Sequence, residues 1–219
     1  NMEYGASCMG YEIAGAFGAK LAEPDKEVYA LVGDGSFMML NSEIPTAMQE
    51  NAKITVVVFD NCAFGCINNL QMGNGVGSLA TEMRHRNETT GKLDGDYCYT
   101  DFGKIGEGFG MKAFYAKTPD EFRKAVQDAK KESVSCIIDA KVLPKTMAEG
   151  YESWWHIGVA STAKSDEVKA ARSSTHVLIK RRFNMSRPFP DGRLRLYNKV
   201  SSKEKRSKNY EIYAQGPLR

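Results

Sequence analysis

Short apolar runs alternate with helix-forming segments along the first 142 residues of the chain. The apolar runs predict strands over residues 27–34, 53–60, 111–117 and 134–142. The segments between them predict helices over residues 11–22, 42–51 and 119–131, with another helix that begins near Gly65. Nearly continuous Val and Ile strands separated by helices are typical of a parallel sheet that is covered on both faces. We therefore expect an α/β fold with a doubly wound, mainly parallel sheet.

Asp34 and Asn61 stand where two of the predicted strands end. In open α/β sheets, ligands bind beyond the carboxyl ends of the strands. If these two strands are neighbours, joined by a right-handed crossover through the helix over 42–51, both side chains project over the same rim of the sheet. A carboxylate and an amide oxygen suit a hard cation, Mg²⁺ or Ca²⁺. A site with such a small number of protein ligands favours Mg²⁺ over Ca²⁺, because phosphate oxygens and water can complete the coordination of Mg²⁺.

The residues around these two side chains also suit a phosphate group. Gly33 and Gly35 would allow the backbone to come close to it, and helix N-termini between Ser36 and Ser42 or at Gly65 would supply N–H donors. A lone Gly-Asp-Gly is more often a turn, because Asp and Gly are leading turn residues. Asn61, at the end of the next strand, follows Asp34 by 27 residues, and that interval contains one helix and one strand. This spacing favours the metal site over a turn.

Charge divides the chain into two unequal parts. Residues 164–219 carry 15 Lys and Arg against 5 Asp and Glu, net +10, and residues 1–163 carry 15 against 22, net −7, which together give the +3 of the whole chain. We expect a ligand-binding domain over 1–163 and a basic tail over 164–219. Clustered Lys and Arg can bind nucleic acid or an anionic surface, but a solvated or disordered extension is the favoured interpretation of this tail. A shifted reading frame is a further hypothesis.

The remaining composition predicts a soluble protein of the reducing cytoplasm. The longest apolar run, ITVVVF, is too short to span a bilayer, so we expect no membrane partner. The five cysteines are odd in number and form no C-x-x-C pair, which predicts small apolar core residues rather than disulfides or a zinc site. The chain starts at Asn1 without an initiator Met, and we interpret it as part of a longer protein.

The segment GDGSFMMLNSEIPTAMQENAKITVVVFDN resembles the metal-binding motif of thiamine diphosphate enzymes. The resemblance implies that the side chains of Asp34 and Asn61, with the backbone carbonyl of Ala63, hold the Mg²⁺ that binds the cofactor diphosphate. Many members have Asn-Asn at the end of this motif, where this chain has Asp60 and Asn61; the second Asn is the usual ligand, so the assignment stands. The implied cofactor-binding residues are Met9, Gly33, Asp34, Gly35, Ser36, Asn61, Ala63, Phe64 and Gly65.

Met9 lies in the segment GASCMGYEIAGAFGAKLA, which resembles the part of the family where a Met braces the bent cofactor. The alternative is that Met9 is ordinary core filler. In the family, a Glu from the pyrimidine-binding domain of a neighbouring subunit activates the cofactor, and no residue here matches it. We therefore name no catalytic residue. We expect a homodimer or homotetramer in the full-length form and little turnover by this chain alone.

Longer stretches, from Asn1 to about Ala160, resemble the branch of this family that opens a cyclic 1,2-diketone in inositol catabolism. Among them are DNCAFGCINNLQMGNGVGS and VLPKTMAEGYESWWHIGVA. They imply ring-opening hydrolysis of an inositol-derived cyclic dione to a deoxyglucuronic acid. Two alternatives stay open: another thiamine diphosphate reaction, such as decarboxylation or carboligation, and a non-catalytic module of the same fold.

Several polar groups are further candidates without an assigned role. His85 and His156 are candidates for proton transfer, and Arg84 and Arg86 for contacts with substrate hydroxyls or a product carboxylate. The alternatives are that the RHRNE segment is a solvated loop and that His156 packs beside the neighbouring tryptophans. The loop MGNGVGS is interpreted either as a mobile cover over the site or as an ordinary connection.

Overall fold

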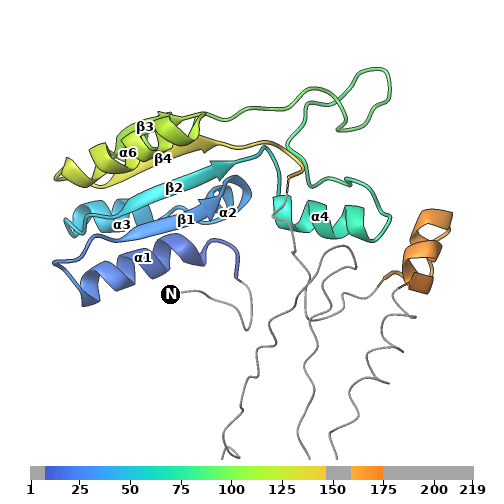
Figure 1. Cartoon of the computed structure of the whole chain (residues 1–219), viewed down its shortest axis with the longest axis horizontal. Coiled ribbons are helices and arrows are strands. Elements are labelled where there is room, and N and C mark those ends of the chain that lie inside the picture. Colours follow the sequence, from blue (N-terminus) through green and yellow to red (C-terminus); the bar gives the residue numbers. More distant parts are fainter. Residues whose placement is uncertain (1–7, 147–158, 175–219) are drawn as a thin grey trace, which may run out of the picture. The chain divides into compact units, whose positions relative to one another are not determined.

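The computed structural model describes residues 8–146 and 159–174, which fall in two units that are treated separately below. The first unit contains, in chain order, α1 (Tyr11–Ala22), β1 (Tyr29–Gly33), α2 (Asp34–Met39), α3 (Glu43–Gln49), β2 (Thr55–Asp60), α4 (Gly65–Gly73), α5 (Phe102–Gly108), β3 (Lys112–Ala116), α6 (Pro119–Lys131) and β4 (Cys136–Lys141) (Figure 1). The predicted α/β fold is confirmed.

The four strands form one parallel sheet in the order β1-β2-β4-β3. β1 and β2 are neighbours with α3 between them in the chain, as the sequence analysis required for Asp34 and Asn61 to meet. Gly33 pairs with Phe59, and Asp60 pairs with Lys141 on β4. The residues that follow β1 and β2 therefore emerge at the same edge of the sheet.

Helices cover both faces of the sheet (Figure 1). On one face, α1, α3 and α5 bury Ile13, Ile44 and Phe102 against the strands. On the other face, α6 places Ala125 and Ala129 against β2 and β4. The strands supply alternate residues to the two sides, so that Val56 and Val58 belong to the first cluster and Val57 to the second.

β1 is covered on one face only. Ala30 and Val32 are buried under α1, whereas Tyr29 and Leu31, which point to the α6 side, are 37% and 60% exposed. α6 packs mainly over β3 and β4, which leaves the α6 side of β1 without a helix in the described part of the chain. We call Tyr29 and Leu31 the open flank of β1.

Two expectations about local structure were wrong. The strand predicted over residues 27–34 ends at Gly33, because Asp34 is the first residue of α2. The five cysteines, which all lie among the described residues, form no disulfide, but only Cys62 and Cys136 are buried core residues, while Cys8 and Cys66 are exposed.

In the second unit, residues 166–174 are helical. The segment assigned to a basic tail thus begins with a helix, and the rest of that segment, residues 175–219, lies outside the described residues. Across the described part of the chain, no helix is both long enough and apolar enough to cross a membrane.

Candidate metal and diphosphate site

The Asp34 carboxylate joins the ends of β1 and β2. It is buried, and its Oδ1 accepts a hydrogen bond from the Gly35 N–H (2.9 Å). Its Oδ2 accepts another from the Ala63 N–H (3.1 Å), on the segment that follows β2. The sequence analysis placed Asp34 and Asn61 at one rim of the sheet, and these bonds bring the two segments together there.

The turn from Asn61 to Ala63 is held in an unusual backbone conformation. Cys62 has a φ of +53°, which non-glycine residues adopt only when their surroundings enforce it. The Cys62 carbonyl accepts from the Met83 N–H, and the Phe64 N–H donates to the Thr81 carbonyl. These two bonds form a short antiparallel bridge between Ala63 and Glu82. The Ala63 carbonyl takes no part in them and is available to a ligand.

The Asn61 side chain carries the clearest sign of a ligand-binding site. Its Oδ1 atom is buried and has no hydrogen-bond partner among the described residues. A buried polar atom without a partner costs about 1–3 kcal/mol, so natural proteins rarely retain one without a reason. A bound cation would supply the partner, because an amide oxygen is a good ligand for a hard cation.

Two glycines of the predicted site are required by close packing. A Cβ atom on Gly35 would lie 2.6 Å from the Phe64 ring, and one on Gly65 would lie 2.5 Å from Nδ2 of Asn61. Real Cβ atoms do not approach other atoms so closely. The Phe64 ring and the Asn61 amide therefore rest on bare backbone, which fixes both of them.

The other predicted cofactor residues lie on the elements around this rim. Gly33 is the last residue of β1, and Ser36 is a half-buried residue of α2. Met9 is half-buried in the turn before α1, where Gly10 (φ +94°) packs against Leu40 directly after α2. Met9 is thus placed beside the end of α2, while its role as a cofactor brace stays a prediction.

An acidic cluster surrounds the rim. It consists of Asp34, Asp60 and Asp139, all buried, and Lys141 forms ion pairs with Asp60 and Asp139. Burial raises the pKa of Asp34 to about 7, the Gly35 and Ala63 N–H groups oppose the rise, and the nearby Asp60 adds to it. Burial also raises the pKa of Asp139, with Lys141 opposing. Asp34 has no ion pair with a cation among the described residues, and a bound cation would supply that partner.

The oxygen donors at the rim fit Mg²⁺ better than a metal that needs three or more His, Cys, Asp or Glu ligands. Among residues 8–146 and 159–174, no three His, Cys, Asp or Glu side chains are grouped to hold a metal ion. A cation at the rim would therefore use the Asp34 carboxylate, the Asn61 amide oxygen and the Ala63 carbonyl. One carboxylate with two neutral oxygens is the sparse set that leaves positions for phosphate oxygens and water.

The basic candidates are engaged elsewhere. Arg84 pairs with Glu82 (3.2 Å), donates to the Gly95 carbonyl (2.8 Å) and stacks 3.8 Å from the Tyr97 ring centroid. Arg86 donates to the Gly91 carbonyl. His85 is exposed on the same loop, and His156 lies outside the described residues.

The loop after α4 is tied to its helix. Asn68 Nδ2 donates to the hydroxyls of Ser78 and Thr81, and Gln71 exchanges two hydrogen bonds with the backbone of Leu79. We call this set of bonds the Asn68–Gln71 latch. The sequence analysis missed it, as it missed Asp139 and Lys141, although a charged Asp139 inside the apolar strand CIIDAK was a visible signal.

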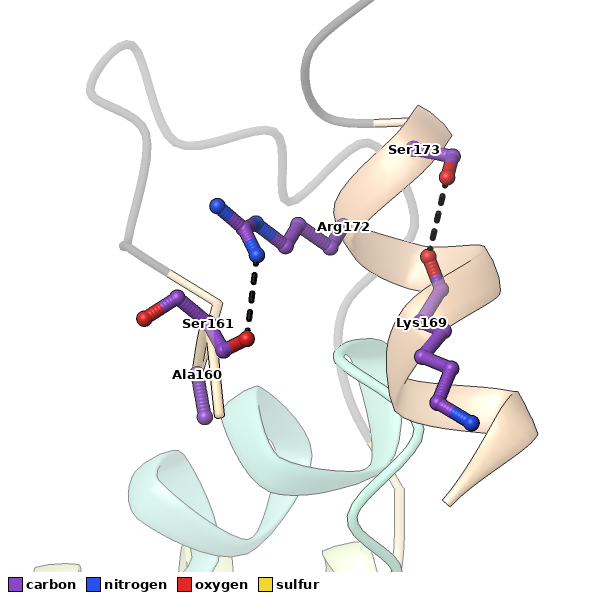
Figure 2. A pocket seen from close by; sticks show the side chains of 5 residues that line it. All are labelled: Ala160, Ser161, Lys169, Arg172 and Ser173. Carbon is purple, nitrogen blue, oxygen red and sulfur yellow. Dashed lines mark hydrogen bonds between the residues drawn. The ribbon is translucent and has the colours of Figure 1, made fainter. Parts of the chain in front are cut away.

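A surface pocket lies in the second unit and is lined by Ala160, Ser161, Lys169, Arg172 and Ser173 (Figure 2). Arg172 donates to the Ser161 carbonyl (3.1 Å), and the Ser173 hydroxyl donates to the Lys169 carbonyl (3.0 Å). None of the predicted site residues lines this pocket.

Comparison with known proteins agrees with this geometry. The model of the thiamine pyrophosphate enzyme family, C-terminal TPP binding domain, matches residues 1–140. A protein of Clostridium botulinum (strain Alaska E43 / Type E3) named 3D-(3,5/4)-trihydroxycyclohexane-1,2-dione hydrolase is 57% identical over 180 residues, which are 82% of this chain and 28% of that protein. One of Geobacillus thermodenitrificans (strain NG80-2) with the same name is 60% identical over 171 residues, 78% of this chain and 27% of that protein.

Two further matches add to these. A Bacillus cereus protein, named 3D-(3,5/4)-trihydroxycyclohexane-1,2-dione hydrolase 1, is 60% identical over 174 residues, which are 80% of this chain and 27% of that protein. The chain thus spans little more than a quarter of these relatives. A solved structure, the thiamine diphosphate-dependent 4-hydroxybenzoylformate decarboxylase of Rhodococcus jostii RHA1, matches with a TM-score of 0.52 at 22% identity, over 63% of this chain and 24% of that one. At that identity the likeness shows the fold alone.

Proposed function

The chain belongs to the thiamine pyrophosphate enzyme family, and on that premise we propose that its first unit binds Mg²⁺ and the diphosphate of this cofactor, which is also called thiamine diphosphate. Asp34 and Asn61 hold the metal through their side chains, and Ala63 does so through its carbonyl. The observation that carries the proposal is the Asn61 Oδ1 atom, buried without a hydrogen-bond partner among the described residues.

The surrounding residues prepare the site before the ligand arrives. The Ala63 N–H fixes Asp34, and the bare backbone of Gly35 and Gly65 fixes Phe64 and Asn61. The rim is buried, so charges there interact more strongly than in water. Because the site is rigid, little ordering remains to oppose binding.

When bound, thiamine diphosphate supplies a nucleophilic carbon and an electron sink for cleaving a C–C bond next to a carbonyl. The residues of this chain bind and orient the diphosphate end. Met9, beside the end of α2, supports the bend of the cofactor. The group that activates the reacting ring belongs to a pyrimidine-binding domain of a neighbouring subunit.

The reaction we propose is ring opening of 3D-(3,5/4)-trihydroxycyclohexane-1,2-dione to 5-deoxyglucuronate. The names of relatives at 57–60% identity support it. The chain is then the cofactor-binding part of a cytoplasmic, homo-oligomeric enzyme of inositol catabolism. Product analysis with the cyclic dione against 2-oxo acids separates this reaction from a decarboxylase or carboligase of the same family.

Calorimetric titration of the 219-residue chain with thiamine diphosphate, with and without Mg²⁺, tests the cofactor site. We expect binding only with Mg²⁺, and a loss of about 100-fold or more in Asp34→Ala, because the metal loses its one carboxylate ligand. Asp120→Ala, at an exposed aspartate of α6, is the matched control and should bind like wild type. Binding without Mg²⁺, or unchanged binding by Asp34→Ala, contradicts the proposal.

A further inference from the structure

Lys141 is the last residue of β4 and the cation at the centre of the acidic cluster. Its ammonium contacts Asp60 Oδ2 (2.5 Å), Asp139 Oδ2 (3.0 Å) and the Thr100 carbonyl (3.0 Å). An ammonium has three N–H donors, and each has an acceptor here. Asp60 and Asp139 are almost completely buried, with side-chain exposures of 2% and 0%. Lys141 therefore has one fixed position.

Asp60 connects Lys141 to the turn from Asn61 to Ala63. Its Oδ2 atom pairs with Lys141, while its Oδ1 atom accepts from the Cys62 N–H (3.0 Å) and from the Cys62 thiol (3.5 Å). Cys62 is the residue with a φ of +53°. A strained backbone of this kind persists only where its neighbours hold it, and Asp60 is one of those neighbours.

The turn is thus fixed by two carboxylates on consecutive N–H groups. Asp60 holds the Cys62 N–H and Asp34 holds the Ala63 N–H. Between β2 and these two anchored groups stands Asn61, whose Oδ1 atom has no partner among the described residues. Asp60 engages Lys141 and Cys62 with its two oxygens and also lies against the Asp34 carboxyl, so it borders the proposed metal ligands, Asp34 and Asn61, and supports them.

From these contacts we propose that Asp60 and Lys141 form a positioning pair that holds the Asn61–Ala63 turn in the conformation that binds Mg²⁺ and the cofactor diphosphate. The inference rests on the proposed function and adds two residues to it that touch neither the metal nor the reacting atoms. Groups that orient metal ligands typically contribute about 10- to 100-fold to metal affinity. Removal of Lys141 leaves Asp60 buried without its cation, and the turn loses its anchor.

The test measures Mg²⁺ and thiamine diphosphate binding by the whole 219-residue chain. Circular dichroism first establishes that each variant is folded. We expect Lys141→Met and Asp60→Asn to raise the Mg²⁺ concentration for half-saturation by about 10- to 100-fold. Lys141→Arg, which keeps the cation, should restore binding to within about threefold of wild type.

Two controls separate positioning from general stability. Lys124→Met removes a lysine from an exposed ion pair on α6 and should bind like wild type. The double variant Asp60→Asn/Lys141→Met should lose no more affinity than the weaker-binding single variant, because the two residues act as a unit. With Mn²⁺ in place of Mg²⁺, the electron paramagnetic resonance spectrum of the bound ion should change in Lys141→Met and not in Lys124→Met.

The outcomes distinguish this inference from the function on which it rests. If wild type fails to bind Mg²⁺ and cofactor, the proposed function falls and the positioning role falls with it. If wild type binds and folded Asp60→Asn and Lys141→Met bind within about twofold of it, the positioning role alone is overturned. Should Lys141→Met not fold, the isosteric Asp60→Asn decides by the same criterion.

Discussion

Asp34 and Asp60 are both buried aspartates at the same edge of the sheet, yet their surroundings differ. Asp60 pairs with Lys141, whereas Asp34 accepts hydrogen bonds from the Gly35 and Ala63 N–H groups, lies beside the Asp60 carboxyl and has no ion pair with a cation among the described residues. Two backbone dipoles oppose the cost of burying a charge but do not cancel it, and the pKa of Asp34 rises to about 7. In the absence of a metal, the ionised Asp34 carboxylate therefore opposes folding at and above neutral pH.

This cost predicts a pH dependence of stability. Asp34 has a folded-state pKa near 7 and an unfolded value near 3.8, so the folded chain holds the proton more tightly. Its contribution to the free energy of unfolding is present below about pH 4 and is lost as pH rises through 7. In metal-free and cofactor-free buffer, wild type should lose on the order of 2 kcal/mol more than Asp34→Asn between about pH 5 and pH 8.

Urea unfolding of both proteins, followed by circular dichroism across that pH range, measures the difference. The comparison with Asp34→Asn removes the contributions of all other titrating groups. Equal pH profiles for the two proteins would show that Asp34 titrates normally. The same experiment with saturating Mg²⁺ and cofactor should flatten the wild-type profile, because a cation offsets the buried charge.

The helices show how far local sequence determines an element. α1 and α6 have the predicted bounds, since each has a clear pattern, and α6 also has a capping box between Thr118 and Glu121. α5 was not predicted, because Gly103, Gly106 and Gly108 lower its helix propensity. It forms because tertiary packing needs the first two of those glycines.

Two contacts explain the glycines of α5. A Cβ atom on Gly103 would lie 2.3 Å from the Tyr115 hydroxyl, and one on Gly106 would lie 2.4 Å from Ile137. Both partners are on strands outside the helix, and no pattern within the helix reveals them. α2 was missed for a similar reason, because its six residues are stabilised by the burial of Phe37 rather than by propensity.

The capping box of α6 gives a prediction at the scale of one element. The Thr118 hydroxyl accepts from the Glu121 N–H (3.2 Å), and the Glu121 carboxylate accepts from the Thr118 N–H (3.1 Å). Thr118→Ala should lower the free energy of unfolding by about 1 kcal/mol. Urea denaturation measures the loss, with Thr89→Ala at an exposed loop position as control. Cofactor affinity should not change, and a loss of affinity would mean that α6 influences the rim.

At the scale of the whole molecule, the sequence indicated the proposed metal ligands more readily than the residues that hold them. Asp34 and Asn61 were proposed from their place at strand ends, and Ala63 from resemblance to the family. Lys141 was not found, because it meets Asp60 across 81 positions of the chain. Only the pairing of β2 with β4 brings the two side chains together, and a strand order is not written in any local pattern.

The length of the chain relative to its relatives predicts its activity in isolation. It spans 27–28% of the relatives that it matches, and in the proposed function the activating group comes from the pyrimidine-binding domain of a neighbouring subunit. We expect the 219-residue chain to bind Mg²⁺ and cofactor but to consume the cyclic dione at a rate close to background. Nuclear magnetic resonance of the substrate measures consumption, with the full-length Bacillus cereus relative assayed alongside. Rapid consumption by the chain alone would contradict the expectation.

The open flank of β1 has a practical consequence for work with this protein. Tyr29 and Leu31 form an apolar strip on a strand whose second edge is unpaired in the described residues. Such an edge offers both hydrogen-bonding groups and apolar surface to another copy, the combination that drives precipitation during concentration and crystallisation trials. Leu31→Lys places a charge on that strip, away from the metal rim, and is the first change to make when preparing the chain for crystallisation.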